Sequence, residues 1–179
     1  MTSQIMKPRG RNTRGFSLLE LLVVIFIIGM IMTFAALSVG GNADRKVEEE
    51  ARRLTALLRL ATEESVMNSR DLAVQLTRKY YDFMTLGIDG KLVPMDKDEE
   101  TFRRRELPDD IMIKEAEIEG ESVALSLDPG ETDEVPSIFI LSSGEMIPFA
   151  LSIGRDEGTD YQIEGDYSGK VEYATKEKQ

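Results

Sequence analysis

Apolar residues follow two different patterns in the first part of the chain. Between Leu21 and Ala43 no side chain is charged, and as an α-helix rising about 1.5 Å per residue this run is about 35 Å long, enough to cross the core of a bilayer. Further along, apolar or small side chains recur at alternating spacings of four and three residues, at Val47, Ala51, Leu54, Leu58, Ala61 and Ser65, with Leu57 beside them. This spacing predicts the apolar face of an amphipathic helix that packs under a sheet.

The opposite face of this second helix carries charges of both signs. Its side chains are Glu48, Glu49, Arg52, Arg53, Arg59, Glu63 and Glu64. The first glutamates precede the first arginines at helical spacing, which predicts acid–base pairs along the helix surface. Gly40 and Gly41 lie between the two helical patterns, where they favour a break or a flexible hinge.

Beyond Arg70 the pattern changes from helical to alternating. Leu72, Val74 and Leu76 fall on one side of a strand, and Asp89-Gly90 is typical of a tight hairpin turn. Further short strands are predicted in YDFMTL, TFRRRE, IMIKEAEI, SVALSL, SIFILS, MIPFALSI, DYQIE and GKVEYAT. Pro148 predicts that MIPFALSI starts at a sheet edge or a bulge, because proline has no amide hydrogen to donate. We therefore expect an α+β fold, in which an antiparallel β-rich head packs on the second half of a long N-terminal helix.

The composition narrows the chemistry that the head can perform. The 179 residues include no histidine and no cysteine, which excludes Ser-His-Asp and Cys-His catalysis, disulfides and thiolate metal sites. Two acidic loops, MDKDEET and LDPGETDEVP, lack the ligand order of an EF-hand, so we interpret them as solvated. We expect no catalytic residue, no cofactor and no assigned metal ligand. Carboxylates are numerous enough for a glycosidase pair, so a membrane-anchored enzyme remains an alternative, although no two of them stand out.

The charges are distributed unevenly around the apolar run. The net charge is −11, yet the only charged side chains before Phe16 are Lys7, Arg9, Arg11 and Arg14. This bias predicts an N-terminus in the cytoplasm and a head on the other side of the membrane. Because an acidic head repels phosphate, we expect no nucleic-acid binding.

The stretch FRRRE is a small basic patch in this acidic head. One interpretation is a strand edge whose charges resist aggregation. The other is a contact with an acidic neighbouring subunit or with an exported substrate.

The apolar run itself has three interpretations. A cleaved secretory signal would have a shorter run and a better cleavage site than ALSVGGNAD. A plain signal anchor explains the length and the flanking charges, but it gives no role to Glu20, a carboxylate near the start of the run. The third interpretation rests on the sequence motif itself. The stretch RGFSLLELLVVIFIIGMI resembles the N-terminus of type IV prepilins and type II secretion pseudopilins. This resemblance implies cleavage after Gly15 by a prepilin peptidase, N-methylation of the new Phe16 amine, and subunit assembly through Glu20.

The C-terminal strands add a second resemblance, to the H-type minor pseudopilins of the GspH/FimT family. The matching features are a strand at Ile138–Leu141, the turn Ser143-Gly144-Glu145, and a proline-containing strand at Met146–Ile153. Many major pilins have a proline inside the N-terminal helix, whereas this chain has none between Pro8 and Pro94. The resemblance therefore implies a type IV pilin-like fold and a structural role as a minor subunit of a type II secretion pseudopilus, not an enzyme.

The resemblance also implies an organisation for the chain. A basic leader peptide would span residues 1–15, a transmembrane and assembly helix 16–43, an amphipathic helix 44–70 and a β-rich periplasmic domain 71–179. The implied partners are other pseudopilins, the prepilin peptidase, the inner-membrane secretion platform, and a secreted substrate or the outer-membrane channel. The protein would cross the inner membrane once. The alternative is a minor type IV pilin for pilus assembly or DNA uptake, and DNA uptake would need a basic exposed head.

Overall fold

The computed structural model describes residues 18–87, 89–95, 100–129 and 134–176, and for residues 34–43 it describes the backbone alone. The chain divides into two compact units, Met1–Val39 and Gly40–Gln179. A long helix, α1 (Leu18–Met67), contributes to both units. The backbone at Gly40 and Gly41 is helical, so the break that these glycines led us to expect is not present, although the boundary between the units lies at the same place.

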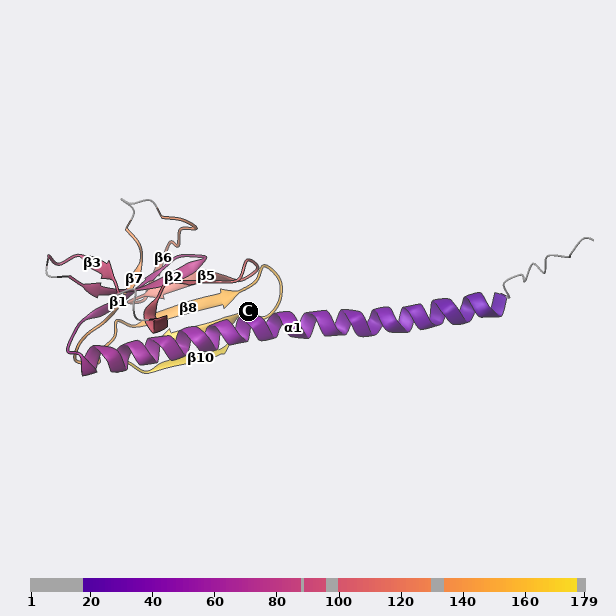
Figure 1. Ribbon diagram of the computed structural model, residues 1–179, viewed down its shortest axis with the longest axis horizontal. Coiled ribbons are helices and arrows are strands. Elements are labelled where there is room, and N and C mark those ends of the chain that lie inside the picture. Colours follow the sequence, from indigo (N-terminus) through magenta and orange to yellow (C-terminus); the bar gives the residue numbers. More distant parts are fainter. Residues whose placement is uncertain (1–17, 88, 96–99, 130–133, 177–179) are drawn as a thin grey trace, which may run out of the picture. The chain divides into compact units, whose positions relative to one another are not determined.

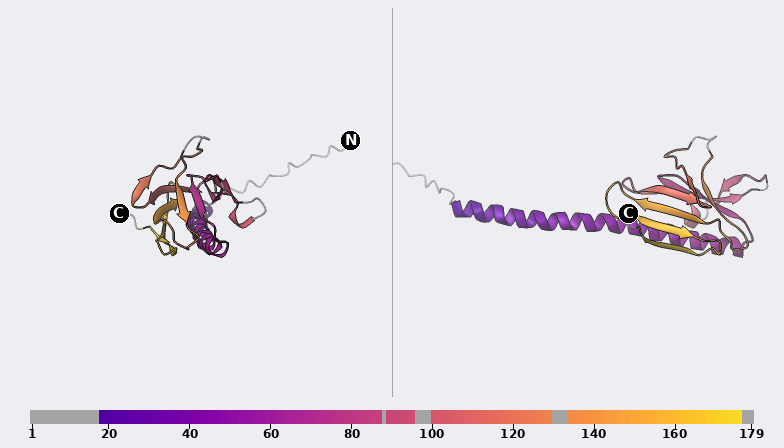
Figure 2. Two further views of the ribbon diagram at one scale, coloured as in Figure 1. Left: turned by 90° about the vertical axis from the view of Figure 1, so that its left-hand side faces the viewer. Right: turned by 180° about the vertical axis from the view of Figure 1, so that it is seen from behind.

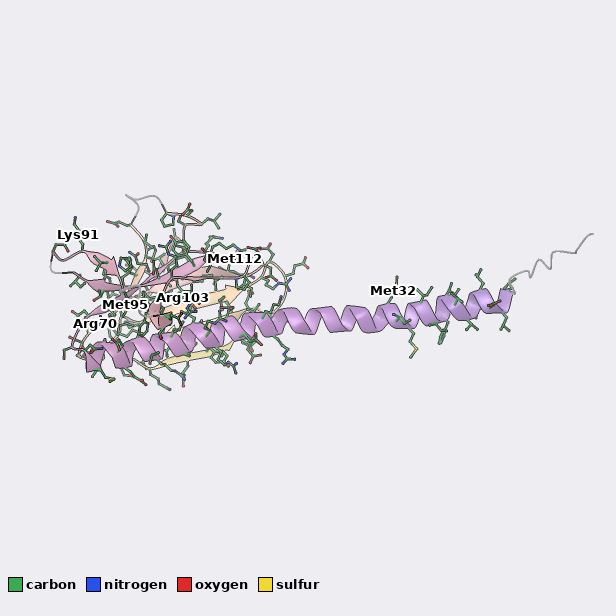
Figure 3. The ribbon with its side chains drawn as sticks, viewed as in Figure 1. Met32, Arg70, Lys91, Met95, Arg103 and Met112 are labelled. Atoms are coloured by element: carbon green, nitrogen blue, oxygen red, sulfur yellow. The ribbon has the colours of Figure 1, made fainter. Side chains whose placement is uncertain are left out.

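In the first unit, the side chains described are those of residues 18–33, and all of them are exposed. Figure 3 shows Met32, 68% exposed, among side chains that project outward from α1. Within the described residues, no helix combines the length and the hydropathy that a membrane span requires. The predicted span 16–43 includes residues 16 and 17 and the side chains of 34–43, which lie outside the described part of the chain.

The helix ends through hydrogen bonds that satisfy its last carbonyls. Ser69 has a φ of 50°, which turns the chain out of the helix. The amide of Ser69 donates to the Val66 carbonyl at 3.3 Å, and the amide of Arg70 donates to the Ser65 carbonyl at 3.1 Å. This pair of bonds is the Schellman arrangement, and it directs the chain into the first strand.

The strands form two five-stranded sheets in which neighbouring strands are antiparallel. The first has the order β3-β2-β1-β7, with β4 also paired to β2; its strands are β1 (Leu72–Leu76), β2 (Tyr80–Leu86), β3 (Leu92–Pro94), β4 (Arg105–Glu106) and β7 (Ser137–Ile140). The second has the order β10-β9-β8-β5-β6, with β5 (Met112–Ile118), β6 (Glu121–Val123), β8 (Phe149–Gly154), β9 (Tyr161–Gly165) and β10 (Val171–Thr175).

Most of the predicted strands are present, and the predicted hairpin is one of them. Leu72, Val74 and Leu76 are all buried, as the alternation in β1 predicts. Strands β2 and β3 pair through the turn at Asp89-Gly90, where the Gly87 amide donates to the Lys91 carbonyl at 2.8 Å.

Three details of the strand prediction are wrong. TFRRRE begins as a 3-10 helix, η1 (Glu100–Phe102), because Phe102 turns into the core, and only Arg105–Glu106 pairs with β2. SVALSL forms a strand only in its first part, within β6. Pro148 precedes β8, which lies in the middle of its sheet and not at an edge, so no ladder bond is required of the proline nitrogen.

The amphipathic part of α1 packs against both sheets in one core. All six residues predicted for its apolar face are fully buried, namely Val47, Ala51, Leu54, Leu58, Ala61 and Ser65. Figure 1 shows this part of α1 lying along the strands, with β10 beside it, and Figure 2 shows the same arrangement from behind. The core cluster joins this helix face to side chains from β1, β2, β5, β7, β8, β9 and β10, so the helix is part of the folded head.

Candidate functional site: the two parts of α1 and the surfaces around them

Glu20 lies in the first turn of α1 and is exposed. Its neighbours Leu19 and Leu21 are also exposed, so the carboxylate stands in an apolar helix surface. A negative charge in the first turn is favoured by the helix dipole. Gly15 and Phe16, the other two predicted site residues, lie outside the described residues. The described residues therefore present an exposed carboxylate that can accept a hydrogen bond or pair with a cation.

The surface around Glu20 is apolar on every side of the helix. The exposed large side chains are Leu18, Leu19, Leu21, Leu22, Val23, Val24, Ile25, Phe26, Ile27, Ile28, Met30, Ile31 and Met32. An exposed apolar surface of this extent marks a region that contacts a membrane or other proteins. The chemistry available here is burial of apolar area around a single carboxylate.

The second part of α1 is fixed to the head by polar contacts that periodicity does not reveal. Arg59 donates from Nε to the Val171 carbonyl at 2.8 Å. Ser65 donates from Oγ to the Leu141 carbonyl at 3.0 Å. Near the start of this part, the Asp44 carboxylate accepts bonds from the amide and the hydroxyl of Thr159 at 3.3 and 3.2 Å. Each partner lies more than seventy positions away in the chain, so sequence spacing gave no signal for these bonds.

The turn Ser143-Gly144-Glu145 packs against the end of α1. Gly144 has a φ of 89°, and a Cβ added to it would lie 3.1 Å from a methyl group of Val66. Glycine is required here both by the left-handed backbone and by the close helix. The amide of Leu141 donates to the Glu145 carbonyl at 2.8 Å, which closes the turn. The motif that resembles the H-type family therefore has a structural role in joining β7 to the helix.

A buried carboxylate lies on the helix beside the first sheet. Glu50 is 7% exposed and accepts a hydrogen bond from Arg53 Nη1 at 2.8 Å. Burial raises the pKa of Glu50, and the positive charge of Arg53 limits the increase. Glu50 and Arg53 are three residues apart, so this pair is one of the acid–base pairs at helical spacing that the sequence predicts.

Tyr81 is the second perturbed group in this region. It is fully buried, and burial together with the negative charge of Glu50 raises its pKa to about 12. Its hydroxyl has no hydrogen-bond partner within the described residues. The tyrosine therefore stays protonated at physiological pH and cannot act as a base.

Two of the three arginines in the basic stretch FRRRE bind partners in the head, although Arg104 is exposed, as Arg103 is. Arg104 donates from Nε to Asp82 Oδ2 at 3.0 Å and stacks 4.4 Å above the Tyr80 ring. Arg105 donates to the carbonyls of Glu100 and Thr101, at 3.0 and 3.3 Å. Arg103, labelled in Figure 3, is exposed. The charges of this stretch therefore serve mainly to fix η1 and β4 against β2.

The outer face of the second sheet has a shallow polar groove over β8. It has a volume of about 370 Å³, and its floor is formed by the small residues Ala150 and Ser152. Glu115 on β5 forms an ion pair with Lys176. The lining contains carboxylates, lysines, two serines and a glutamine, and the buried Ser152 hydroxyl has no hydrogen-bond partner among the described residues. Among the described residues no group of acidic side chains is placed to hold a metal ion; residues 96–99 and 130–133 of the acidic loops are not described.

Comparison with known proteins gives matches over both parts of the chain. A prokaryotic N-terminal methylation motif matches residues 10–36, a range that includes Gly15, Phe16 and Glu20, and the family of the type II transport protein GspH matches residues 50–169. The type II secretion system protein H of Pseudomonas aeruginosa is 30% identical, over 87% of this chain and 92% of the relative. The protein of the same name from Aeromonas hydrophila is 28% identical, over 96% of this chain and 98% of the relative.

A solved structure shares the fold. The crystal structure of the minor pseudopilin EPSH from the type II secretion system of Vibrio cholerae superposes with a TM-score of 0.60 and 19% identity, covering 73% of this chain and 96% of that chain.

Proposed function

Because the chain belongs to the family of the type II transport protein GspH, we propose that it works as a minor pseudopilin in a type II secretion pseudopilus. The observation that carries this proposal is the contrast within α1. Residues 18–33 expose apolar side chains around one carboxylate, whereas the second part of the helix is buried in a β-rich head. A chain built in this way is held by the first part and presents the head to other molecules.

Processing by a prepilin peptidase is the first step of this proposal. The enzyme cleaves after Gly15 and methylates the amine of Phe16. Support comes from the basic residues before Gly15 and from the match of residues 10–36 to the methylation motif. Cleavage at this position leaves the apolar helix attached to the head, unlike removal of an ordinary signal peptide.

Pairing of Glu20 with a neighbouring subunit is the second step. A carboxylate at the centre of a membrane helix costs roughly 2.5–3.5 kcal/mol, and less near the end, where Glu20 lies. Cleavage creates a positive amine on Phe16, four residues before Glu20, and at the rise of an α-helix four residues correspond to about 6 Å along the axis. A neighbour shifted by that distance places its Phe16 amine beside this Glu20. Removal of one partner of a buried pair costs roughly 3–5 kcal/mol, so the pair both joins the subunits and sets their shift.

The remaining features of the proposal are a single membrane crossing, with the N-terminus in the cytoplasm and the head in the periplasm, and assembly with other pseudopilins on the inner-membrane platform. A secreted substrate or the outer-membrane channel is a further partner. The acidic composition, with a net charge of −11, supports a structural and interaction role over DNA uptake.

Complementation tests the function. In a host from which the corresponding gene is deleted, we expect the wild-type chain to restore export of folded proteins to the medium. Glu121→Ala, an exposed carboxylate of the head, should restore it equally. Restoration of pilus-dependent DNA uptake without restoration of export would favour the minor type IV pilin instead.

The intact mass of the protein purified from its native host tests the processing separately. The expected species begins at Phe16 and carries one methyl group on its amine. Recovery of the uncleaved chain, or a cut after Gly41, would contradict the proposal.

A further inference from the structure

The outer face of the second sheet has a floor of small side chains along β8. Leu151 and Ile153 are buried in the core cluster. Side chains alternate along a strand, so Ala150 and Ser152 face the other way, out of the head. Because both are small, the backbone of β8 lies at the bottom of the shallow groove, which continues past Ala150 into a second hollow of about 280 Å³.

Longer side chains stand on both sides of this floor, because β5 and β9 pair with β8 in register. Glu117 and Glu164 lie opposite Ala150, one on each side. The acidic trough, as we name this part of the surface, consists of Ala150, Ser152, Glu115, Glu117, Gln162 and Glu164. Its walls are long polar side chains and its floor is small, so the side chain of another molecule can enter it.

The half of the acidic trough over Ala150 has an excess of negative charge. The hollow there is lined by four carboxylates and one lysine. That lysine, Lys170, already pairs with Glu172 at 2.9 Å. The Glu117 carboxylate is exposed and has no partner among the described residues, and Glu164 accepts one hydrogen bond, from an uncharged amide, at 2.7 Å. Two carboxylates without a paired cation therefore face each other across the floor.

The half of the acidic trough over Ser152 contains a buried polar group without a partner. Ser152 is 4% exposed, and its hydroxyl forms no hydrogen bond among the described residues. An unpaired buried hydroxyl is costly, so a ligand that hydrogen-bonds to it gains affinity. A cation already lies nearby, because Lys176 pairs with Glu115 on the adjacent strand. The chain's own lysine thus shows that a basic side chain can be held in this trough.

We propose that the acidic trough binds an extended segment of another protein in which arginines alternate with small residues. Alternate side chains of an extended chain point the same way and lie about 7 Å apart, and Ala150 and Ser152 have the same two-residue separation along β8. One guanidinium lies over Ala150, between Glu117 and Glu164. The other reaches the Ser152 hydroxyl and competes there with Lys176.

Arginine fits this arrangement better than lysine. A guanidinium has five donors in a planar fork, whereas an ammonium has three donors at one point. The trough presents acceptors on both walls above a flat floor, so a planar cation can bind both walls at once. This inference goes beyond the proposed function, because it names the chemistry of a partner that the head recognises, and its test does not depend on assembly of a pseudopilus.

Peptide binding to the purified full-length protein in a non-ionic detergent tests the inference. The probe is the dye-labelled peptide Gly-Ala-Arg-Ala-Arg-Ala-Gly, followed by fluorescence anisotropy. In two control peptides both arginines are replaced, by lysine or by citrulline, which has the shape of arginine without its charge. We expect the Kd of the arginine peptide to be about threefold lower than that of the lysine peptide and about tenfold lower than that of the citrulline peptide. Added salt should weaken the binding.

Substitutions in the acidic trough locate the binding. Glu117→Gln and Glu164→Gln should each raise the Kd of the arginine peptide about fivefold, and Ser152→Ala about threefold. Lys176→Ala should lower it about threefold, because the competing cation is removed. Glu121→Gln is the matched control, since Glu121 is an exposed carboxylate of the same sheet that lines neither hollow, and it should leave the Kd unchanged.

Three results would overturn the inference. They are absence of binding by the arginine peptide up to about 1 mM, equal Kd values for the arginine and citrulline peptides, and a Kd that Glu117→Gln and Glu164→Gln leave unchanged. Weaker binding by Lys176→Ala would contradict the competition. An unchanged urea midpoint shows that each variant is folded. Failure of the wild-type chain to restore export, in contrast, rejects the proposed function and leaves the peptide result standing.

Discussion

The two parts of α1 share a backbone conformation and differ completely in burial. From Leu18 to residue 33 every side chain is exposed, and most are large and apolar. From Val47 to Ser65 the apolar face is fully buried against two sheets, and the other face is charged. Stability in the second part comes from the chain itself. In the first part, every described side chain is exposed, so this apolar area is available for contact with a membrane or with other proteins.

The role of a given residue type therefore depends on which part of α1 contains it. A leucine in the second part is a structural residue whose loss unfolds the head, whereas a leucine in the first part is a contact surface. The two carboxylates differ in the same way, because the one in the second part is buried and the one in the first part is exposed. Glu50 in the second part accepts a hydrogen bond from Arg53, while Glu20 in the first part is exposed.

The largest expected difference between the two parts of α1 is the loss of stability when a leucine is truncated to alanine. Leu54→Ala removes a fully buried side chain, and we expect it to lower the free energy of unfolding of the head by roughly 2–5 kcal/mol. Leu60→Ala, 40% exposed in the same part, and Leu22→Ala, exposed in the first part, should each change it by less than about 0.5 kcal/mol. Urea unfolding of the full-length protein in detergent measures this, followed by near-ultraviolet circular dichroism. All five tyrosines lie in the head, so the signal is followed in the tyrosine band, which reports on the head. If Leu22→Ala lowered the free energy of unfolding as much as Leu54→Ala does, the proposed difference between the two parts would be contradicted.

An arginine pair tests the polar attachment of the helix. Arg59→Ala removes the bond to the Val171 carbonyl on the edge strand β10, and we expect a loss of about 1 kcal/mol because the site is partly exposed. Arg52→Ala is the matched control, because Arg52 is exposed and bonds to nothing within the described residues. The same unfolding experiment applies. Equal effects of the two substitutions would show that Arg59 contributes no more to the attachment than a surface arginine.

The smallest expected effect is the pH dependence that Glu50 introduces. Burial raises the pKa of Glu50 in the folded protein, so the folded state holds this proton more tightly than the unfolded chain does. The contribution of Glu50 to stability is therefore complete below the ordinary carboxyl pKa and is lost as the pH rises through the raised pKa.

Glu50→Gln removes that titration and keeps the side-chain shape. We expect the stability of the variant relative to wild type to increase as the pH rises from about 4 to about 7. Asp166, whose pKa is lowered by its hydrogen bond from Ser168, acts in the opposite direction in both proteins and cancels. A relative stability that is constant over this range, or that falls, would be inconsistent with a buried, raised Glu50.

Periodicity predicted the parts of the fold that depend on one element at a time. The apolar face of the helix and the alternation in β1 were both correct, because burial of one face follows directly from residue spacing. The prediction was wrong where tertiary contacts decide. The conformation of FRRRE is determined by the burial of Phe102 and by the carbonyls that Arg105 binds. Neither contact can be predicted from an alternating pattern. The bond from Arg59 to Val171 spans 112 positions, so no local signal could reveal it.

The candidate site was predicted in a different way. A short sequence motif with fixed spacing identified Gly15, Phe16 and Glu20. Only Glu20 lies among the described residues. Structure adds that Glu20 stands in an exposed apolar surface. The buried Glu50 was missed because EEE looks like a uniformly solvated run, and only packing shows that its third carboxylate turns inward.

The central claim is that the first part of α1 acts through Glu20 in assembly while the head folds independently of it. The most direct measurement is the amount of Glu20→Ala protein that cross-links to partner pseudopilins, at membrane levels equal to wild type. We predict a decrease of about tenfold or more, as expected when one partner of a buried ion pair is removed, with an unchanged urea midpoint for the head. Undiminished cross-linking and export in Glu20→Ala would contradict the account.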